Sequence, residues 1–289
     1  MIILDVRLGR TNGRVQIHLF ISSSRPAISS YLTRVPSKYF RPGTERAAKV
    51  EDLFAAIAPR YDLINDLQSF GLHRYWKRKL LVLAAPQPGE TALDVCCGTG
   101  DVAFALANAG ALTTGFDFSA GMLEIAARRQ AALDPSVAQR LTFRQGDALH
   151  LPFDDATFNL VTISYGLRNL ADFDRGTREL TRVLTPHGRL VILDFGKPDQ
   201  PLWRWVYFQY LRWICPWFGR LFCGDRDTHG YILDSLKAYP AQRGVAMKLE
   251  ELGFQESRLI QLLGGMMSLH YGRKTLPLGT TTGLPQNPL

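Results

Sequence analysis

The sequence predicts an α/β protein built on a doubly wound, mostly parallel sheet. Between residues 91 and 195, five short apolar runs that end in polar residues alternate with stretches of helical periodicity. Such alternation is typical of parallel sheets, in which a helix returns the chain to the start of the next strand. Two further apolar runs lie close together near the C-terminus, and they predict an antiparallel hairpin at one sheet edge.

Composition limits the class of protein. The chain has 289 residues, of which 46% are hydrophobic and 21% charged, and this fits one large domain with appendages. No run reaches the roughly 18 apolar residues of a spanning helix. The net charge of +8 favours acidic partners, either nucleic acid or an anionic membrane surface. Four cysteines are too few for a disulfide framework, and Cys215, Cys223 and His229 lack zinc-like spacing, so no metal is expected.

The two ends of the chain differ from its middle. Residues 1–45 are rich in Ser and Arg, with Asp5 and Glu45 as the only acids. We expect a disordered basic extension there, and an organelle transit peptide is the alternative. The tail at 275–289 is rich in Pro, Gly and Thr and is also expected to be disordered.

A helical cap is predicted over residues 46–86. The stretch AAKVEDLFAAIAPRYDLINDLQSFGLHRYWKRKLLVLAA places apolar residues at helical spacing, with breaks at Pro59 and Gly71.

The main domain is predicted over residues 87–274. Its parallel strands are expected in TALDVCC (91–97), ALTTGFDF (111–118), LTFRQGD (141–147), FNLVTISY (158–165) and GRLVILDF (188–195). Helices are expected over 120–133, 174–186 and 241–254, and the edge hairpin over 257–263 and 268–274. An aromatic helical insert, residues 199–239, interrupts this pattern after the fifth strand.

The first strand ends in a glycine turn, LDVCCGTGDVA. Gly98 and Gly100 allow a tight turn and a close approach of the backbone to a ligand, which a Cβ would prevent. By itself this signal is weak, because Gly98, Gly100 and Ala103 also satisfy the dinucleotide-binding pattern.

Acidic residues around the turn favour a different ligand. Asp94 precedes the glycines and Asp101 follows them, and both would repel the pyrophosphate of a dinucleotide. S-adenosylmethionine instead brings an ammonium group and a sulfonium cation. Asp117 ends the second strand and could accept both ribose hydroxyls, and Asp147 ends the third and could accept the adenine amino group. Taken singly, each Asp could equally be a helix cap or a turn residue.

Several motifs resemble the quinone C-methyltransferases of ubiquinone, menaquinone and phylloquinone synthesis, over residues 48–274. They are LFAAIAPRYDLINDLQSFGLHRYWK, LDVCCGTGD, GFDFSAGML, GDALHLPF, ISYGLRNL, RVLTPHGRLVILDF and GGMMSLHYGRK. The resemblance implies a class I, Rossmann-like methyltransferase with a seven-stranded sheet, which uses S-adenosylmethionine to methylate a ring carbon of a prenylated hydroquinone. The predicted cofactor site comprises Asp94, Gly98, Thr99, Gly100, Asp117, Phe118, Met122, Asp147, Ala148 and Ser164.

Three residues are candidates for catalysis. Methylation of carbon requires a hydroquinone that has lost a hydroxyl proton and is held away from water. Arg168 could stabilise the phenolate or polarise a water that takes the proton, and Asn169 could orient that water. Tyr61 could hydrogen-bond a quinol oxygen. The alternatives are a salt bridge that holds the loop for Arg168, a turn residue for Asn169 and a buried, capped tyrosine for Tyr61. His270 is a weaker candidate, and no residue is a secure general base.

The stretch PLWRWVYFQYLRWICPWFGRLF, residues 201–222, holds four of the five tryptophans. Tryptophan and tyrosine suit the boundary between membrane and water, and Arg204, Arg212 and Arg220 could reach lipid phosphates. We therefore expect a cytoplasmic protein that associates peripherally with membranes. A helix pair that packs on the core or on a second subunit, as in a homodimer, is the alternative.

Two rival functions are compatible with the predicted fold and cofactor. A nucleic-acid methyltransferase would carry an Asn/Asp-Pro-Pro-aromatic turn or a Pro-Cys nucleophile, but SYGLRN follows the fourth strand and Cys215-Pro216 has the reverse order. No nucleic-acid partner is therefore expected. A scaffold that binds the cofactor without catalysis is the second rival. For the substrate, the motifs favour demethylmenaquinol, with 2-polyprenyl-6-methoxy-1,4-benzoquinol next and the phylloquinone ring as a further alternative.

Overall fold

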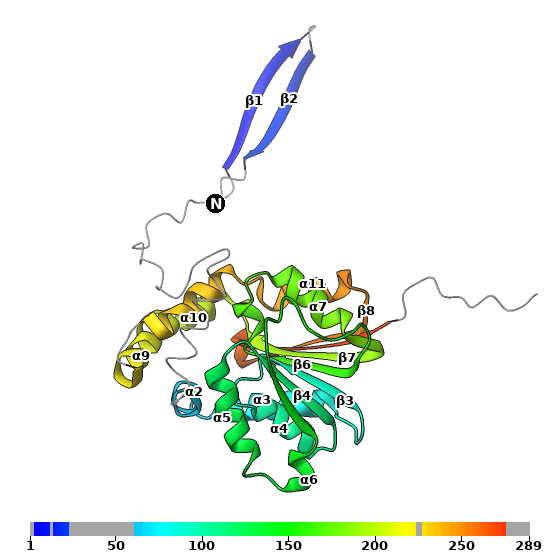
Figure 1. Ribbon diagram of the computed structural model, residues 1–289. Coiled ribbons are helices and arrows are strands. Elements are labelled where there is room, and N and C mark those ends of the chain that lie inside the picture. The colour runs from blue at the N-terminus through cyan, green and yellow to red at the C-terminus, as the bar shows by residue number, and fades with distance from the viewer. Residues whose placement is uncertain (1–2, 12–13, 23–60, 224–226, 276–289) are drawn as a thin grey trace, which may run out of the picture. The chain divides into compact units, whose positions relative to one another are not determined.

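The computed structural model describes residues 3–11, 14–22, 61–223 and 227–275 (Figure 1). The chain divides into two compact units, Met1–Val35 and Pro36–Leu289. Residues 23–60, which include Pro59 and the first part of the predicted cap, lie outside the described residues, and so does the predicted tail from residue 276.

The first unit contains an antiparallel hairpin. Strand β1 (Ile3–Thr11) pairs with β2 (Arg14–Ser22) from Ile3 opposite Ser22 to Thr11 opposite Arg14. The predicted disordered extension, residues 1–45, thus includes two segments described as strands, and its residues 23–45 lie outside the described residues. Apolar residues alternate with others along both stretches, and Asn12-Gly13 between them is a strong hairpin signal that the basic composition obscured.

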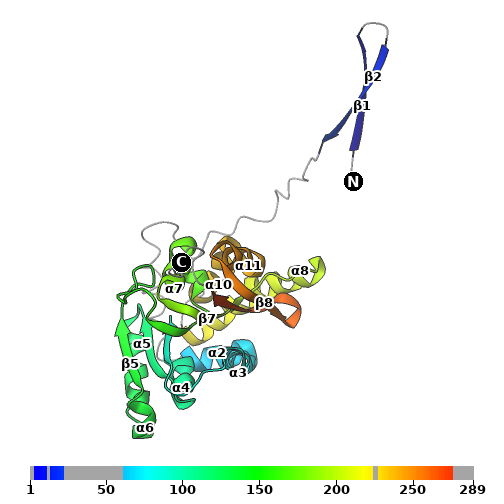
Figure 2. The same ribbon diagram turned by 90° about the vertical axis from the view of Figure 1, so that its right-hand side faces the viewer.

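The second unit is built on a seven-stranded sheet with the order β5-β4-β3-β6-β7-β9-β8 (Figures 1 and 2). Strands β3 to β7 are parallel, and β9 runs antiparallel to both β7 and β8. The predicted parallel sheet with an antiparallel edge hairpin is therefore confirmed. The strands are β3 (Thr91–Val95), β4 (Leu112–Asp117), β5 (Leu141–Gln145), β6 (Phe158–Ser164), β7 (Leu184–Phe195), β8 (Phe254–Leu262) and β9 (Met267–Lys274).

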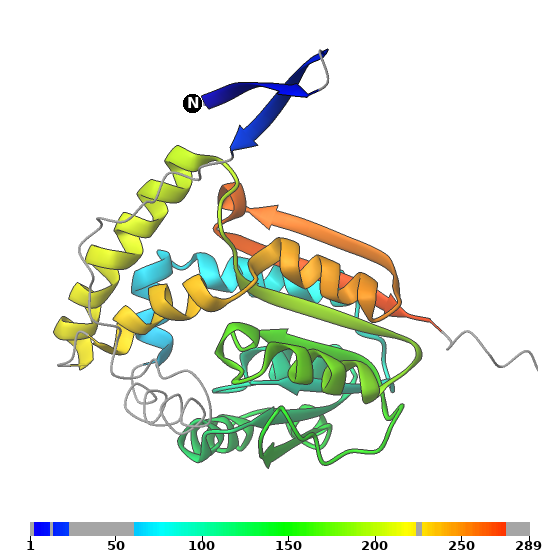
Figure 3. The same cartoon turned by 90° about the horizontal axis from the view of Figure 1, so that it is seen from above.

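Helices cover both faces of the sheet (Figure 3). On one face, Trp76 and Leu80 of α3 and Leu106 of α4 pack against the sheet, and on the other Leu180 of α7 and Val245 of α11 do so. Full burial of side chains of this size contributes about 1.5–3 kcal/mol each. The helices are α2 (Tyr61–Ser69), α3 (Leu72–Ala84), α4 (Asp101–Asn108), α5 (Ala120–Gln130), α6 (Pro135–Ala138), α7 (Phe173–Arg182), α8 (Pro201–Gln209), α9 (Cys215–Cys223), α10 (Asp227–Ala238) and α11 (Ala241–Glu251).

The boundary between the helix after the fourth parallel strand and the fifth parallel strand shifts. The helix expected over 174–186 ends at Arg182, and β7 already begins at Leu184. Pro186 explains the difference, because proline inside a helix removes a hydrogen bond and clashes with the preceding turn. The predicted helix break at Gly71 is present: Gly71 has φ +74° and separates α2 from α3.

The aromatic insert forms a long helix with a wide turn in its middle. A π-helical turn, Tyr210–Ile214, joins α8 to α9, and the Cys215 N–H donates to the carbonyl of Tyr210, five residues back. Pro216 follows at once and has no N–H for the regular ladder, which favours such a local widening. In the described part of the chain, none of the helices combines the length and hydrophobicity that crossing a bilayer requires.

Candidate active site

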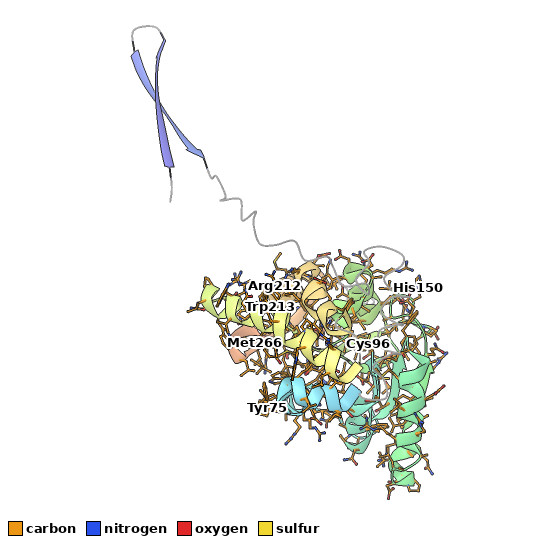
Figure 4. The ribbon with its side chains drawn as sticks, turned by 90° about the vertical axis from the view of Figure 1, so that its left-hand side faces the viewer. Tyr75, Cys96, His150, Arg212, Trp213 and Met266 are labelled. Atoms are coloured by element: carbon orange, nitrogen blue, oxygen red, sulfur yellow. The ribbon has the colours of Figure 1, made fainter. Side chains whose placement is uncertain are left out.

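A cavity opens at the carboxyl ends of the parallel strands. It measures about 810 Å³ together with the space at its mouth, which lies in the range of small-molecule sites. Cys96, which follows β3, lies in its wall (Figure 4). The cavity brings together eight of the predicted site residues: Gly98, Asp117, Phe118, Met122, Asp147, Ala148, Ser164 and Asn169.

The two glycines of the turn have different roles. Gly98 has φ +56°, and a Cβ there would meet no protein atom within 4 Å, so its backbone faces open space. Gly100 has φ +92°, and a Cβ there would come within 2.8 Å of the Phe104 ring. Gly98 therefore lines the cavity, whereas Gly100 allows the turn to pack on α4 and does not line it. Thr99 does not line it either and is almost fully buried.

Asp117 is held by the backbone at the end of β4. Its Oδ2 accepts from the Gly98 N–H at 2.8 Å and its Oδ1 from the Ser119 N–H at 2.9 Å. Burial raises the pKa of Asp117, and these backbone donors partly oppose the shift. A carboxylate has about four acceptor positions, so capacity remains for the two ribose hydroxyls of the predicted donor.

Asp94 lies beneath the turn and does not line the cavity. Its side chain is fully buried, and Oδ1 accepts from the Thr162 hydroxyl at 2.7 Å. Oδ2 has no hydrogen-bond partner among the described residues. Burial raises the pKa of Asp94 to about 7, although the Thr162 hydroxyl opposes the shift. A buried oxygen without a partner suits a ligand that carries an ammonium group.

Asp101 departs from the expectation that it faces a cationic ligand. Its two oxygens accept from Lys77 at 2.7 Å and from Arg129 at 2.6 Å, outside the cavity lining. Burial alone would raise its pKa, but the two cations lower the pKa to about 2. Its charge is thus compensated within the protein.

The far end of the cavity combines one carboxylate with apolar walls. Asp147 is partly exposed, and its Oδ1 accepts from the Leu149 N–H at 2.9 Å. Phe118, Met122 and Ala148 line the same space. Flat apolar walls beside a hydrogen-bond acceptor suit a purine with an amino group.

Of the predicted catalytic residues, Asn169 lines the cavity and Arg168 does not. The Arg168 Nη1 donates to the Asn169 Oδ1 at 2.7 Å and to the Ser235 hydroxyl at 3.0 Å. Its Nε lies 3.4 Å from the Asp194 Oδ1, and the guanidinium stacks 4.7 Å from the centre of the Phe195 ring. The Tyr61 side chain lies outside the described residues. His270 is buried in β9, away from the cavity.

Cys96 and Tyr165 are among the cavity residues that sequence reasoning missed. Each follows a strand directly, and each has a positive φ, +56° and +59°, which is uncommon for residues other than glycine. A Cβ on Gly166 would come within 2.4 Å of the Cys96 Cβ, so the two loops meet closely at this point. The position of both residues immediately after a parallel strand was the available signal.

Solved structures share this fold. A methyltransferase from Aquifex aeolicus that depends on S-adenosylmethionine superimposes with a TM-score of 0.50 at 18% identity, covering 68% of this chain and 88% of that one. The [4+2]-cyclase SpnF superimposes with a TM-score of 0.55 at 17% identity, covering 84% of this chain and 100% of that one. The fold alone therefore does not determine the reaction.

The seven-stranded order with its antiparallel edge is the Rossmann-like fold that the solved methyltransferase shares. Residues 43–274 match the ubiE/COQ5 methyltransferase family, and the chain belongs to it.

Curated relatives support this membership. A demethylmenaquinone methyltransferase of Desulfitobacterium hafniense is 37% identical over 80% of this chain and 92% of its own length. One of Lactiplantibacillus plantarum is 39% identical over 78% and 95%. A ubiquinone/menaquinone biosynthesis C-methyltransferase of Cellvibrio japonicus is 36% identical over 81% and 94%.

The protein is thus a methyltransferase that uses S-adenosylmethionine, which supplies a methyl group on a sulfonium centre. The cavity fits this donor, because it joins Gly98 of the glycine turn, the Asp117 carboxylate and apolar walls.

Proposed function

We propose that the protein methylates a ring carbon of a prenylated hydroquinone, and that demethylmenaquinol is converted to menaquinol. The observation that best supports this proposal is that Asn169 lines the donor cavity. Asn169 belongs to the YGLRN segment, which resembles the quinone enzymes. The names of the relatives from D. hafniense and L. plantarum agree with this substrate. The relative from C. japonicus is named for both quinones, so the benzoquinol is the second candidate.

The geometry suits proton removal next to the donor. Asn169 is fixed at both ends, since its Oδ1 accepts from Arg168 and its Nδ2 donates to the Tyr165 carbonyl at 3.1 Å. In our proposal its amide orients the quinol oxygen or a water beside it. Arg168 acts through Asn169 and supplies positive charge that favours the phenolate form. The phenolate then directs electron density to the ortho carbon, and the apolar walls keep bulk water away.

We further propose that the insert meets a membrane surface, from which the quinol tail enters. One stripe of the helix, Tyr207, Leu211 and Cys215, is buried against the core. The opposite side is apolar too, and a helix that is apolar all round calls for a second apolar environment. The exposed side chains are Leu202, Trp203, Trp205, Val206, Trp213, Ile214, Trp217 and Leu221.

Arg212 and the neighbouring helix α2 extend the exposed apolar surface of the insert. Arg212 stacks 5.1 Å from the Trp213 ring (Figure 4), and arginine at such a boundary can bind lipid phosphate. The Tyr210 hydroxyl donates to the Gln68 carbonyl of α2 at 2.8 Å. Helix α2 adds Leu67, and Phe70, which directly follows the helix, is 80% exposed. A second copy of the chain is the alternative occupant.

The test is a methyl-transfer assay with labelled S-adenosylmethionine and a panel of demethylated, reduced quinones, with tRNA and DNA as controls. We expect label in the naphthoquinol, and less or none in the benzoquinol. Preference for the benzoquinol would move the assignment to the second candidate. Transfer to nucleic acid alone would overturn the proposal, and donor binding without any turnover would indicate a scaffold.

A further inference from the structure

Asp101, the first residue of α4, joins three helices. Its Oδ2 accepts from Lys77 of α3 at 2.7 Å, and its Oδ1 accepts from Arg129 of α5 at 2.6 Å. The Lys77 side chain is 14% exposed and that of Asp101 is 27% exposed, so this pair is screened less by water and salt than a surface pair would be.

The same arginine reaches the glycine turn. The Arg129 Nη1 donates to the Thr99 carbonyl at 2.9 Å and to the Thr99 hydroxyl at 3.1 Å. The guanidinium also lies 5.0 Å from the centre of the Phe104 ring, against which Gly100 packs. Side chains from α3, α4 and α5 thus fix the turn at the residues that immediately follow Gly98.

The position of Gly98 in turn affects the donor site. Its N–H donates to the Asp117 Oδ2, and both residues line the cavity. A small displacement of the turn would weaken this hydrogen bond and change the orientation of the carboxylate assigned to the ribose hydroxyls. The ion pair between Lys77 and Asp101 lies outside the cavity, so it acts on the cavity through the backbone of the glycine turn.

We propose that Lys77 is a positioning residue for the methyl donor. By holding Asp101, it fixes the start of α4 and the glycine turn, and it attaches the cap helix α3 to the donor site. Asp101 then serves the site as the partner of two cations and makes no contact with the donor. This inference depends on donor binding alone and is independent of which quinol is methylated.

The test measures affinity for S-adenosylhomocysteine by titration calorimetry on three variants of the full chain. Lys77→Met keeps the length of the side chain and removes its charge, and we expect about tenfold weaker binding. Lys77→Arg should restore the affinity to within about twofold, since a cation is returned to Asp101. Lys79→Met is the matched control, because Lys79 is exposed on the same helix and should bind as the wild type does.

Steady-state kinetics and a double-mutant cycle distinguish a positioning role of Lys77 and Asp101 from direct contact with the donor. The KM for S-adenosylmethionine should rise with Lys77→Met, while kcat at saturating donor stays within about twofold. Asp101→Asn should weaken binding, and its effect should be less than additive with Lys77→Met because the two residues act as one unit. Additive effects would indicate direct donor contact by Asp101. Unchanged binding in Lys77→Met, or equal loss in Lys79→Met, would overturn the proposal.

Discussion

The Arg168 Nε lies 3.4 Å from the Asp194 Oδ1, and both side chains are buried at the end of β7. The Arg168 backbone N–H also donates to the Asp194 Oδ2 at 3.0 Å, so the carboxylate holds both the main chain and the side chain of the YGLRN loop. Burial raises the pKa of Asp194, and the Arg168 guanidinium opposes the shift. The loop that carries Asn169 therefore depends on a buried ion pair.

Removal of Arg168 should lower both the stability of the protein and the rate of methyl transfer. Arg168→Ala leaves Asp194 buried without its cation, and we expect the free energy of unfolding to fall by about 3 kcal/mol in urea titrations. The double variant Arg168→Ala with Asp194→Asn should recover more than half of this loss. In that folded background, turnover should remain low while donor affinity stays near that of the wild type. Equal loss of turnover and affinity would indicate a purely structural role.

The two glycines of the turn should respond differently to alanine. A Cβ on Gly98 meets no protein atom but points to the cavity side, so Gly98→Ala should mainly weaken donor binding, with about 1 kcal/mol of backbone strain. Gly100→Ala drives a Cβ into the Phe104 ring and should lower stability by about 2–3 kcal/mol. Calorimetric affinity and urea denaturation of each variant test this. The reverse pattern would contradict our assignment of the two roles.

Most of the fold was predictable because its signals are local. Strand–helix alternation predicted the parallel sheet, and Asp117 and Asp147, which were singled out at strand ends, line the cavity at the carboxyl edge of that sheet. Side-chain direction was less predictable. Asp101 follows the turn in sequence, yet it faces Lys77 and Arg129, which lie 24 and 28 residues away.

The direction of the Arg168 side chain was also not predictable from the sequence. Spacing could place it after the fourth strand but could not distinguish a cation that faces the substrate from one paired with Asp194, because the partner comes from a different strand. The positive φ angles of Cys96 and Tyr165 were also not predictable, because residues other than glycine rarely adopt them and the sequence around these two residues carries no signal for them. Long-range packing decided each of these positions.

Donor binding should depend on pH through Asp94. Its folded pKa of about 7 means that the buried carboxyl group is largely protonated below neutrality. A cationic donor favours the ionised form, so affinity for S-adenosylmethionine should rise from pH 5.5 to about 7 and level off between pH 7 and 8. Calorimetry in buffers of different ionisation enthalpy should detect proton release near pH 6.5. Asp94→Asn should bind more weakly and show a flat profile; a pH profile like that of the wild type would contradict this assignment.

His270 should affect stability at acid pH. Its Nε2 is buried without a hydrogen-bond partner among the described residues, and burial lowers its pKa to about 4. Between pH 6.5 and 4 the unfolded chain therefore takes up a proton that the folded chain does not, so the wild type should lose stability as the pH falls through this window. His270→Leu removes both the unpaired nitrogen and this loss, and it should be about 1 kcal/mol more stable at pH 7. Urea titrations at pH 7 and pH 5 compare the two proteins, and a larger loss in the variant would refute the prediction.

The exposed tryptophans of the insert should control membrane binding. Trp213 and Trp217 are 63% and 54% exposed, and burial of such side chains in the lipid boundary contributes about 1.5–3 kcal/mol each. Replacement of both by serine should therefore reduce co-sedimentation with phosphatidylglycerol vesicles at least about tenfold. The control Val82→Ser with Met247→Ser removes apolar side chains of α3 and α11 that are more exposed than the two tryptophans, and it should bind as the wild type does. Arg212→Gln should weaken binding to anionic vesicles only, by about fivefold, since one basic residue near such a surface contributes about 1 kcal/mol. If the tryptophan variant instead converts a dimer to a monomer in sedimentation velocity while vesicle binding is unchanged, a second copy of the chain covers this surface.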